Sequence, residues 1–151
     1  MKYVKRTIQG IQTKDYVSEV ENSSLKSFLN RLCLMNGSTY DGRIESSKFL
    51  LHTKGLVPFY VSNEMVFFSS KNIREFDVIF INTIRVLKVV SVTNGKVKIV
   101  FDDLDELLLN VSFNKLYRQY MLSKEILKRL LWKRKCLHLP YINRFLHGYL
   151  V

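Results

Sequence analysis

The stretch VLKVVSVTNGKVKIVF, residues 86–101, carries the strongest local structural signal in the chain. Asn94 and Gly95 tolerate positive φ, which both central residues of a type I′ turn require. β-Branched residues, which favour strands, are frequent on both sides of this dipeptide. The pattern predicts a β-hairpin in which residues 86–93 pair with residues 96–101.

A two-residue turn at this hairpin also predicts which side chains share a face. It places Thr93 opposite Lys96 and Ser91 opposite Lys98, and these four side chains form the predicted solvent-exposed face. The predicted core face consists of Val90, Val92, Val97, Ile99 and Phe101.

Outward from this hairpin, the apolar pattern remains one of short strands separated by turns. Asn63-Glu64 is typical of a hairpin turn, and residues 102–106 form an acidic one. Residues 36–42 are rich in Gly, Asn, Asp and Ser, which predicts a loop. Further strands are predicted at residues 3–7, 16–20, 49–52, 59–61, 65–69 and 107–111.

From Phe113 the apolar period changes to that of a helix. The predicted apolar stripe contains Leu116, Tyr120, Leu127, Leu130 and Leu131, and the predicted basic side contains Arg118, Lys128, Arg129 and Lys133. Pro140 is expected to end this helix or to open a second one, because proline is disfavoured in a helix interior. Strands first and a helix last predict an α+β fold with a mainly antiparallel sheet, in a single domain over residues 1–151.

The charge of the chain is strongly basic and uneven. The formal net charge is +11 over 151 residues, and residues 114–151 contain nine Lys or Arg against one acid, Glu125. A basic surface attracts polyanions, although many small proteins are basic only for solubility. The N-terminal residues lack the apolar segment of a secretory signal, and no apolar run is long enough to span a bilayer. We therefore expect a cytoplasmic protein.

No constellation of residues typical of an enzyme occurs in the sequence. The histidines, at 52, 138 and 147, match no HExxH motif, and neither GxSxG nor a phosphate-binding loop is present. Cys136 with His138 and His147 offers three zinc ligands but no fourth, which argues against a metal site. The sequence therefore predicts no catalytic residues and no cofactor.

Residues 33–43, CLMNGSTYDGR, resemble the Cys-x-x-x-Gly-Ser-Ser-Tyr-x-Gly-Arg signature of the competence transcription factor family, the ComK-like proteins, with Thr39 in place of Ser. A second segment, from Ile99 through residues 111–116 to Gln119, is similar to the family's strand, turn and strand leading into a helix. The resemblance extends over residues 32–121 in the family's order and leaves a basic helical tail at 122–151. Between the two segments the correspondence is looser, as in a divergent member.

The resemblance implies an activator that binds AT-rich boxes in double-stranded DNA, largely through the minor groove, and switches on DNA-uptake genes. It also implies self-association, and RNA polymerase is a further candidate partner of an activator. The predicted DNA-binding residues are Ser38, Thr39, Tyr40, Arg43, Lys96, Lys98, Arg118, Lys128 and Arg129.

Each of these residues also has a structural interpretation. Arg43 is as well suited to pairing inside its own domain as to entering a narrow minor groove, and exposed hairpin lysines often only protect a sheet. Two other classes of function stay open. The helix around Trp132 could dock on an anionic membrane surface, or the chain could be an interaction module without a polyanion partner.

Overall fold

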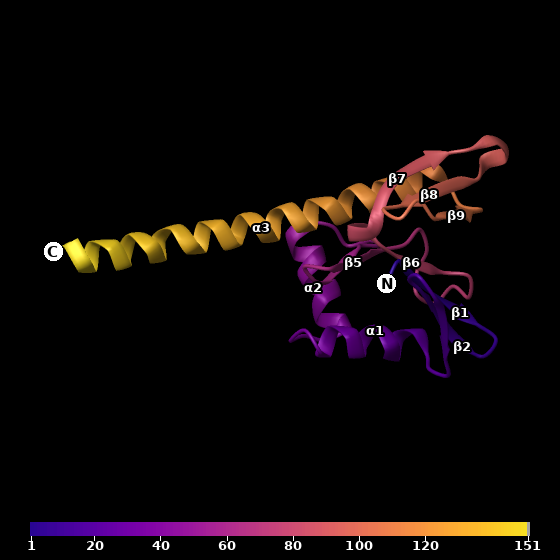
Figure 1. Ribbon diagram of the computed structural model, residues 1–151, viewed down its shortest axis with the longest axis horizontal. Helices are drawn as coiled ribbons and strands as arrows, with labels where there is room; N and C mark the ends of the chain where they lie inside the picture. The colour runs from indigo at the N-terminus through magenta and orange to yellow at the C-terminus, as the bar shows by residue number, and fades with distance from the viewer. Residues whose placement is uncertain (151) are drawn as a thin grey trace.

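The computed structural model describes the backbone of residues 1–150 and the side chains of residues 1–131 (Figure 1). It confirms the α+β class, with short antiparallel strands and a long C-terminal helix. The helices are α1 (Leu25–Leu34), α2 (Tyr40–Leu51) and α3 (Phe113–Leu150). The strands are β1 (Tyr3–Thr7), β2 (Gly10–Lys14), β3 (Ser18–Glu21), β4 (Phe59–Ser62), β5 (Met65–Phe68), β6 (Ile79–Asn82), β7 (Val86–Ser91), β8 (Val97–Phe101) and β9 (Glu106–Leu109).

The strands form two antiparallel sheets, one in the order β3-β2-β1-β6-β5-β4 and one in the order β7-β8-β9. The first core lies between the six-stranded sheet and helices α1 and α2, and it includes Val4, Ile11, Leu29, Tyr40 and Phe59. The second core joins this sheet to the three-stranded sheet and α3, and it includes Phe68, Ile81, Ile99, Phe101 and Leu116.

The segment after β3 is helical, where the sequence predicted a loop and a strand. Ser24 caps α1, because its hydroxyl accepts the backbone N–H of Ser27. Thr39 caps α2 in the same way by accepting the N–H of Gly42. The loop predicted at 36–42 therefore ends at Thr39, and the strand predicted at 49–52 is wrong because residues 49–51 continue α2.

The hairpin between β7 and β8 is confirmed, but its predicted register is wrong by one residue. The turn holds three residues, Thr93–Gly95, and the N–H of Val92 donates to the carbonyl of Lys96 over 3.0 Å. Ser91 therefore lies opposite Val97, where the prediction placed it opposite Lys98. The core face of β8 is as predicted, whereas on β7 Val89 packs in the core in place of Val90.

Helix α3 is continuous to Leu150, so the break predicted at Pro140 is wrong. Leu, Lys and Arg, which are good helix formers, are frequent in the residues that precede the proline. The buried side of α3 consists of Leu116, Gln119, Tyr120, Ser123 and Ile126. The predicted stripe continued to Leu131, but Leu127 is only partly buried and Leu131 is 51% exposed. Toward its C-terminal end α3 extends away from the two sheets (Figure 1).

Three predicted features lie outside the described side chains. They are the basic residue Lys133, the helix segment around Trp132, and the candidate ligands Cys136, His138 and His147. No helix among the described residues combines the length and apolarity that a bilayer-spanning segment needs.

Candidate nucleic-acid interface

The segment from Ser38 to Arg43 forms the entry into α2. Ser38 is partly exposed, and Thr39 is the capping residue of α2. Tyr40 is buried, with its ring edge-on to that of Phe59 at 5.1 Å between centroids. Burial raises the pKa of the Tyr40 phenol to about 12, so this hydroxyl stays protonated at neutral pH. The structure thus gives Thr39 and Tyr40 local roles in capping and packing.

Arg43 belongs to α2 and is tied to its own domain. Its guanidinium donates to the carbonyl of Asn36 over 2.7 Å and lies above the ring of Tyr60 at 5.3 Å. Its Nε is buried without a hydrogen-bond partner in the described part of the chain. These contacts agree with the structural interpretation of Arg43, and its proposed contact with DNA stays a prediction.

Four exposed cations, Lys115, Arg118, Lys124 and Lys128, are distributed around the solvent-exposed half of α3, and we call this half the α3 cation face. Among the described residues none of them forms an ion pair. Lys124 lies above the ring of Tyr120 at 4.6 Å. At 1.5 Å per residue the face extends along about 20 Å of helix. Lys115 and Lys124, which were not among the predicted DNA-binding residues, lie on this face with the predicted Arg118 and Lys128.

Arg129 was predicted to lie with these cations but points toward the body of the protein. Its Nε pairs with Glu125 at 2.9 Å, and its Nη1 donates to the carbonyl of Leu50 over 2.5 Å. This second contact joins α3 to the C-terminal end of α2. Arg129 also holds the pKa of Glu125 below its usual value. Glu125 is therefore ion-paired with Arg129, and Arg129 stabilises the packing of α3 against α2.

The hairpin of β7 and β8 carries further cations. Lys88 and Lys96 are exposed, and the described structure shows no ion pair for either. Lys98 is partly exposed and pairs with Glu106 on β9 at 3.4 Å. Of the two predicted hairpin lysines, Lys96 is therefore the one with an unpaired charge.

Several acidic side chains pair inside the protein instead of facing these cations. Lys2 is only 2% exposed, and its ammonium lies 2.5 Å from Asp103 and 3.1 Å from Asp105. Burial by itself lowers the pKa of Lys2, but the hydrogen bonds to both aspartates raise it above the ordinary value. Arg85 pairs with Asp15 at 2.7 Å and with Asp102 at 2.9 Å. The acidic turn predicted at 102–106 is thereby largely neutralised.

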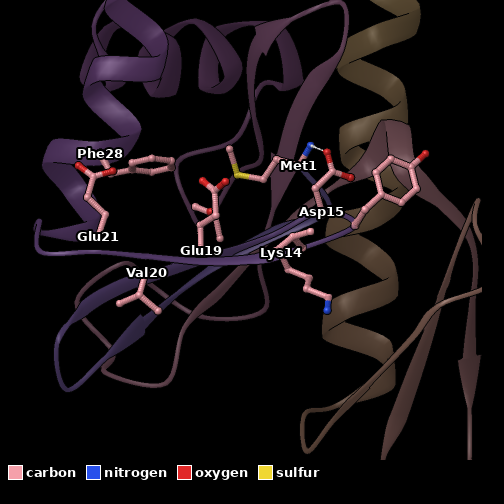
Figure 2. Close-up of a pocket in the computed structure, with 10 residues that line it drawn as sticks. Met1, Lys14, Asp15, Glu19, Val20, Glu21 and Phe28 are labelled. Atoms are coloured by element: carbon pink, nitrogen blue, oxygen red, sulfur yellow. Dashed lines mark hydrogen bonds and ion pairs between the residues drawn. The ribbon is translucent and has the colours of Figure 1, made fainter.

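An acidic hollow of about 480 Å³ lies between the β2–β3 hairpin and α1. Figure 2 shows Glu19, Glu21 and Phe28 on the α1 side of the sheet, with Val20 and Lys14 on the opposite side. Asp15 lines the hollow and is held by the N-terminal amine and by Arg85, whose hydrogen bond lowers its pKa. Glu21 pairs with Arg31, and Glu19 forms no ion pair among the described residues, so Glu19 is the carboxylate of this hollow that would repel a phosphate.

The described residues contain no cluster of three or more His, Cys, Asp or Glu able to hold a metal ion. Cys33 is a free, buried cysteine whose thiol pKa is raised to about 11 by burial, which keeps it protonated and unreactive. The described surface is distinguished instead by its exposed cations.

An α+β fold with a long basic helix and internally paired acids defines a small basic protein without an evident catalytic centre among the described residues. The family model described as ComK protein matches residues 4–135, most of the chain, and the chain belongs to this family. ComK proteins are transcription factors of competence and not enzymes. The match extends beyond residues 32–121, over which the sequence resemblance was traced, to β1–β3 and to more of α3. No curated protein and no solved structure gives a match.

Proposed function

We propose that this protein is a sequence-specific activator of DNA-uptake genes that binds AT-rich duplex DNA, largely through the minor groove. The α3 cation face is the observation that carries this proposal, because four exposed cations follow one helix and its single acid, Glu125, is paired with Arg129. Lysine and arginine that meet phosphates release condensed counterions, which is the main source of sequence-independent affinity for DNA.

The predicted DNA-binding residues then divide into two groups. Arg118, Lys128 and Lys96 are exposed and meet phosphates directly, with Lys98 joining them once its pair with Glu106 opens. The other five also support the fold or the α2 entry, and their contact with DNA remains part of the proposal. These are Ser38, Thr39, Tyr40, Arg43 and Arg129.

Three further parts of the proposal follow from the family. The protein works in the cytoplasm, self-associates to read repeated boxes, and contacts RNA polymerase at its target promoters. Phosphate contacts set the position of the protein on the duplex, whereas discrimination of A·T pairs requires contacts in a groove or a response to its width.

The proposal is tested by fluorescence anisotropy with labelled AT-rich and GC-rich duplexes of equal length at physiological salt. We expect tighter binding to the AT-rich duplex. Equal affinity for both would refute the sequence-specific part. Anionic phospholipid vesicles serve as a second ligand, and binding to vesicles without binding to either duplex would replace the proposal by docking on a membrane surface.

A further inference from the structure

The tip of the β1–β2 hairpin presents an apolar side chain to solvent. Thr7 and Gly10 are the last paired residues, so the turn consists of Ile8 and Gln9. The side chain of Ile8 is 100% exposed. A single exposed apolar residue is normal on a protein surface, so its surroundings must decide whether it has a role.

A hollow of about 570 Å³ lies beside this tip. Its lining residues are Lys5, Arg6, Thr7, Ile8, Gln9, Gln12, Val20 and Phe76. No acidic side chain is among them, and Phe76 is 67% exposed. Val20 and the carboxylates of Glu19 and Glu21 point to opposite sides of the sheet (Figure 2). The hollow therefore combines apolar, cationic and amide groups on the side away from the acidic hollow.

The hairpin is held in place on the six-stranded sheet. Arg6 donates through Nη1 to the carbonyl of Glu75 over 2.7 Å. Gly10 has φ of 132° and lies against the turn that follows β3, where a Cβ atom would come within 2.2 Å of the Glu21 carbonyl oxygen. Only glycine fits at this place. A tip anchored on both strands can push against a ligand without folding back.

The β1–β2 hairpin projects at the same end of the long axis as the β7–β8 hairpin, opposite the C-terminal end of α3 (Figure 1). The second hairpin carries the exposed cations Lys88 and Lys96. Two hairpins with cations at one end of a basic protein form an arrangement that suits a polyanion.

We propose that Ile8 is a wedge that enters a base step of duplex DNA from the minor groove, while Lys5 meets the phosphate backbone and Gln9 the base edges. This inference rests on the proposed function and assigns it a DNA-deforming residue. Minor-groove proteins use Arg, Lys and Gln to read the groove and insert apolar side chains such as Ile between base steps, which kinks the duplex. Protein–protein interface cores are depleted in Lys, so Lys5 favours DNA as the occupant, and the hollow has no acidic side chain that would repel phosphates.

The test compares wild-type protein with Ile8→Ala and with a matched control, Val17→Ala. Val17 is also a highly exposed apolar residue in a turn, the one between β2 and β3, but it lines the acidic hollow. Anisotropy gives the affinity for an AT-rich duplex, and energy transfer between dyes at its two ends gives the bend. We expect wild type and Val17→Ala to shorten the end-to-end distance. Ile8→Ala should lose most of the shortening and bind about tenfold more weakly, the ratio that corresponds to ~1.4 kcal/mol.

The outcomes separate this inference from the proposed function. If wild type binds no duplex, the proposed function fails first. If wild type binds without shortening the duplex, or if Ile8→Ala shortens it as wild type does, the wedge is wrong while DNA binding stands. If Ile8→Ala turns an oligomer into a monomer and leaves the bend unchanged, the tip is a contact between protein copies. Thermal melting confirms that the substitution of this fully exposed residue leaves the fold intact.

Discussion

Replacing the α3 cation face tests the proposed electrostatic contact most directly. The perturbation is the fourfold variant in which Lys115, Arg118, Lys124 and Lys128 become Gln. All four side chains are exposed and none forms an ion pair among the described residues, so the fold should tolerate their loss. The net charge falls from +11 to +7, since four positive charges are removed.

The magnitude follows from counterion release. Each phosphate contact contributes about 0.9 to the slope of log affinity against log salt, so four contacts contribute about 3.6. Between 50 and 200 mM NaCl that slope corresponds to a loss of affinity of about 150-fold. We expect this contribution in the wild-type protein and not in the variant. The variant should therefore bind more weakly at low salt and show a much flatter salt dependence.

Anisotropy titrations at several NaCl concentrations measure this slope. The matched control replaces Lys26, Lys48, Lys54 and Arg74 by Gln, which also lowers the charge to +7 but lies on α1, α2 and the loops. We expect the control to retain most of the wild-type slope. If the control flattens the slope as much as the α3 variant does, net charge alone attracts the DNA and the α3 cation face is not its binding surface.

Three predictions concern stability. Arg129→Ala should lower the free energy of unfolding by about 1–2 kcal/mol, because the Leu50 carbonyl loses a charged donor, whereas Lys128→Ala should stay within about 0.5 kcal/mol; equal urea midpoints would contradict the anchoring role of Arg129. Ile126→Ala should lower the free energy of unfolding by about 3 kcal/mol, because it leaves a cavity at a fully buried site, and Leu131→Ala should lower it much less. A larger loss of thermal stability in Leu131→Ala would show that the predicted apolar stripe, and not the observed one, is buried. The lowered pKa values of Asp15, Asp103 and Asp105 mean that their stabilisation is present above the unfolded pKa of about 3.9 and is lost as pH falls through the lower folded values. Asp103→Asn with Asp105→Asn should destabilise at pH 7 and reduce this acid sensitivity, and adding Lys2→Met should restore stability, because the buried ammonium no longer lacks a partner; no rescue in pH-dependent melts would show that Lys2 is not the reason.

The fold was predictable where one face of an element is buried and the other is not. The β7–β8 hairpin and the start of α3 have such patterns. Helix α2 does not, because its apolar residues lie on more than one side and Phe49 is 74% exposed. The register of the hairpin was predicted wrongly because the same apolar pattern is compatible with a two-residue and a three-residue turn. The additional turn residue shifts every pair of the hairpin by one position.

Helix α1 was missed although its signal is present. Leu25, Phe28, Leu29, Leu32 and Cys33 recur at the spacing of one helical face. Ser24 stands at the capping position before them. The short strand before this segment and the predicted loop at residues 36–42 after it obscured the change of period, although the helical spacing itself is present.

The candidate site was harder to predict, because a sequence gives the number of cations and not their partners. Arg129 and Lys128 are neighbours in the chain, but one turns to the Leu50 carbonyl and the other to solvent. Lys2 belongs to a basic N-terminus and is nevertheless buried by two aspartates a hundred residues away. Tertiary contacts alone decide which charges remain available.

The uneven pairing of charge indicates which cations are available to attract a polyanion. Lys2 and Arg85 together occupy Asp15, Asp102, Asp103 and Asp105 at the junction of the two sheets. On α3 the one acid is taken by Arg129, so the α3 cation face keeps its four charges unpaired. Because charges paired at short distance contribute little to the distant field, long-range attraction of DNA is governed by the unpaired ones. We therefore expect a duplex to be attracted by the α3 cation face together with Lys88 and Lys96 of the β7–β8 hairpin, and the proposed insertion of Ile8 to follow this electrostatic contact.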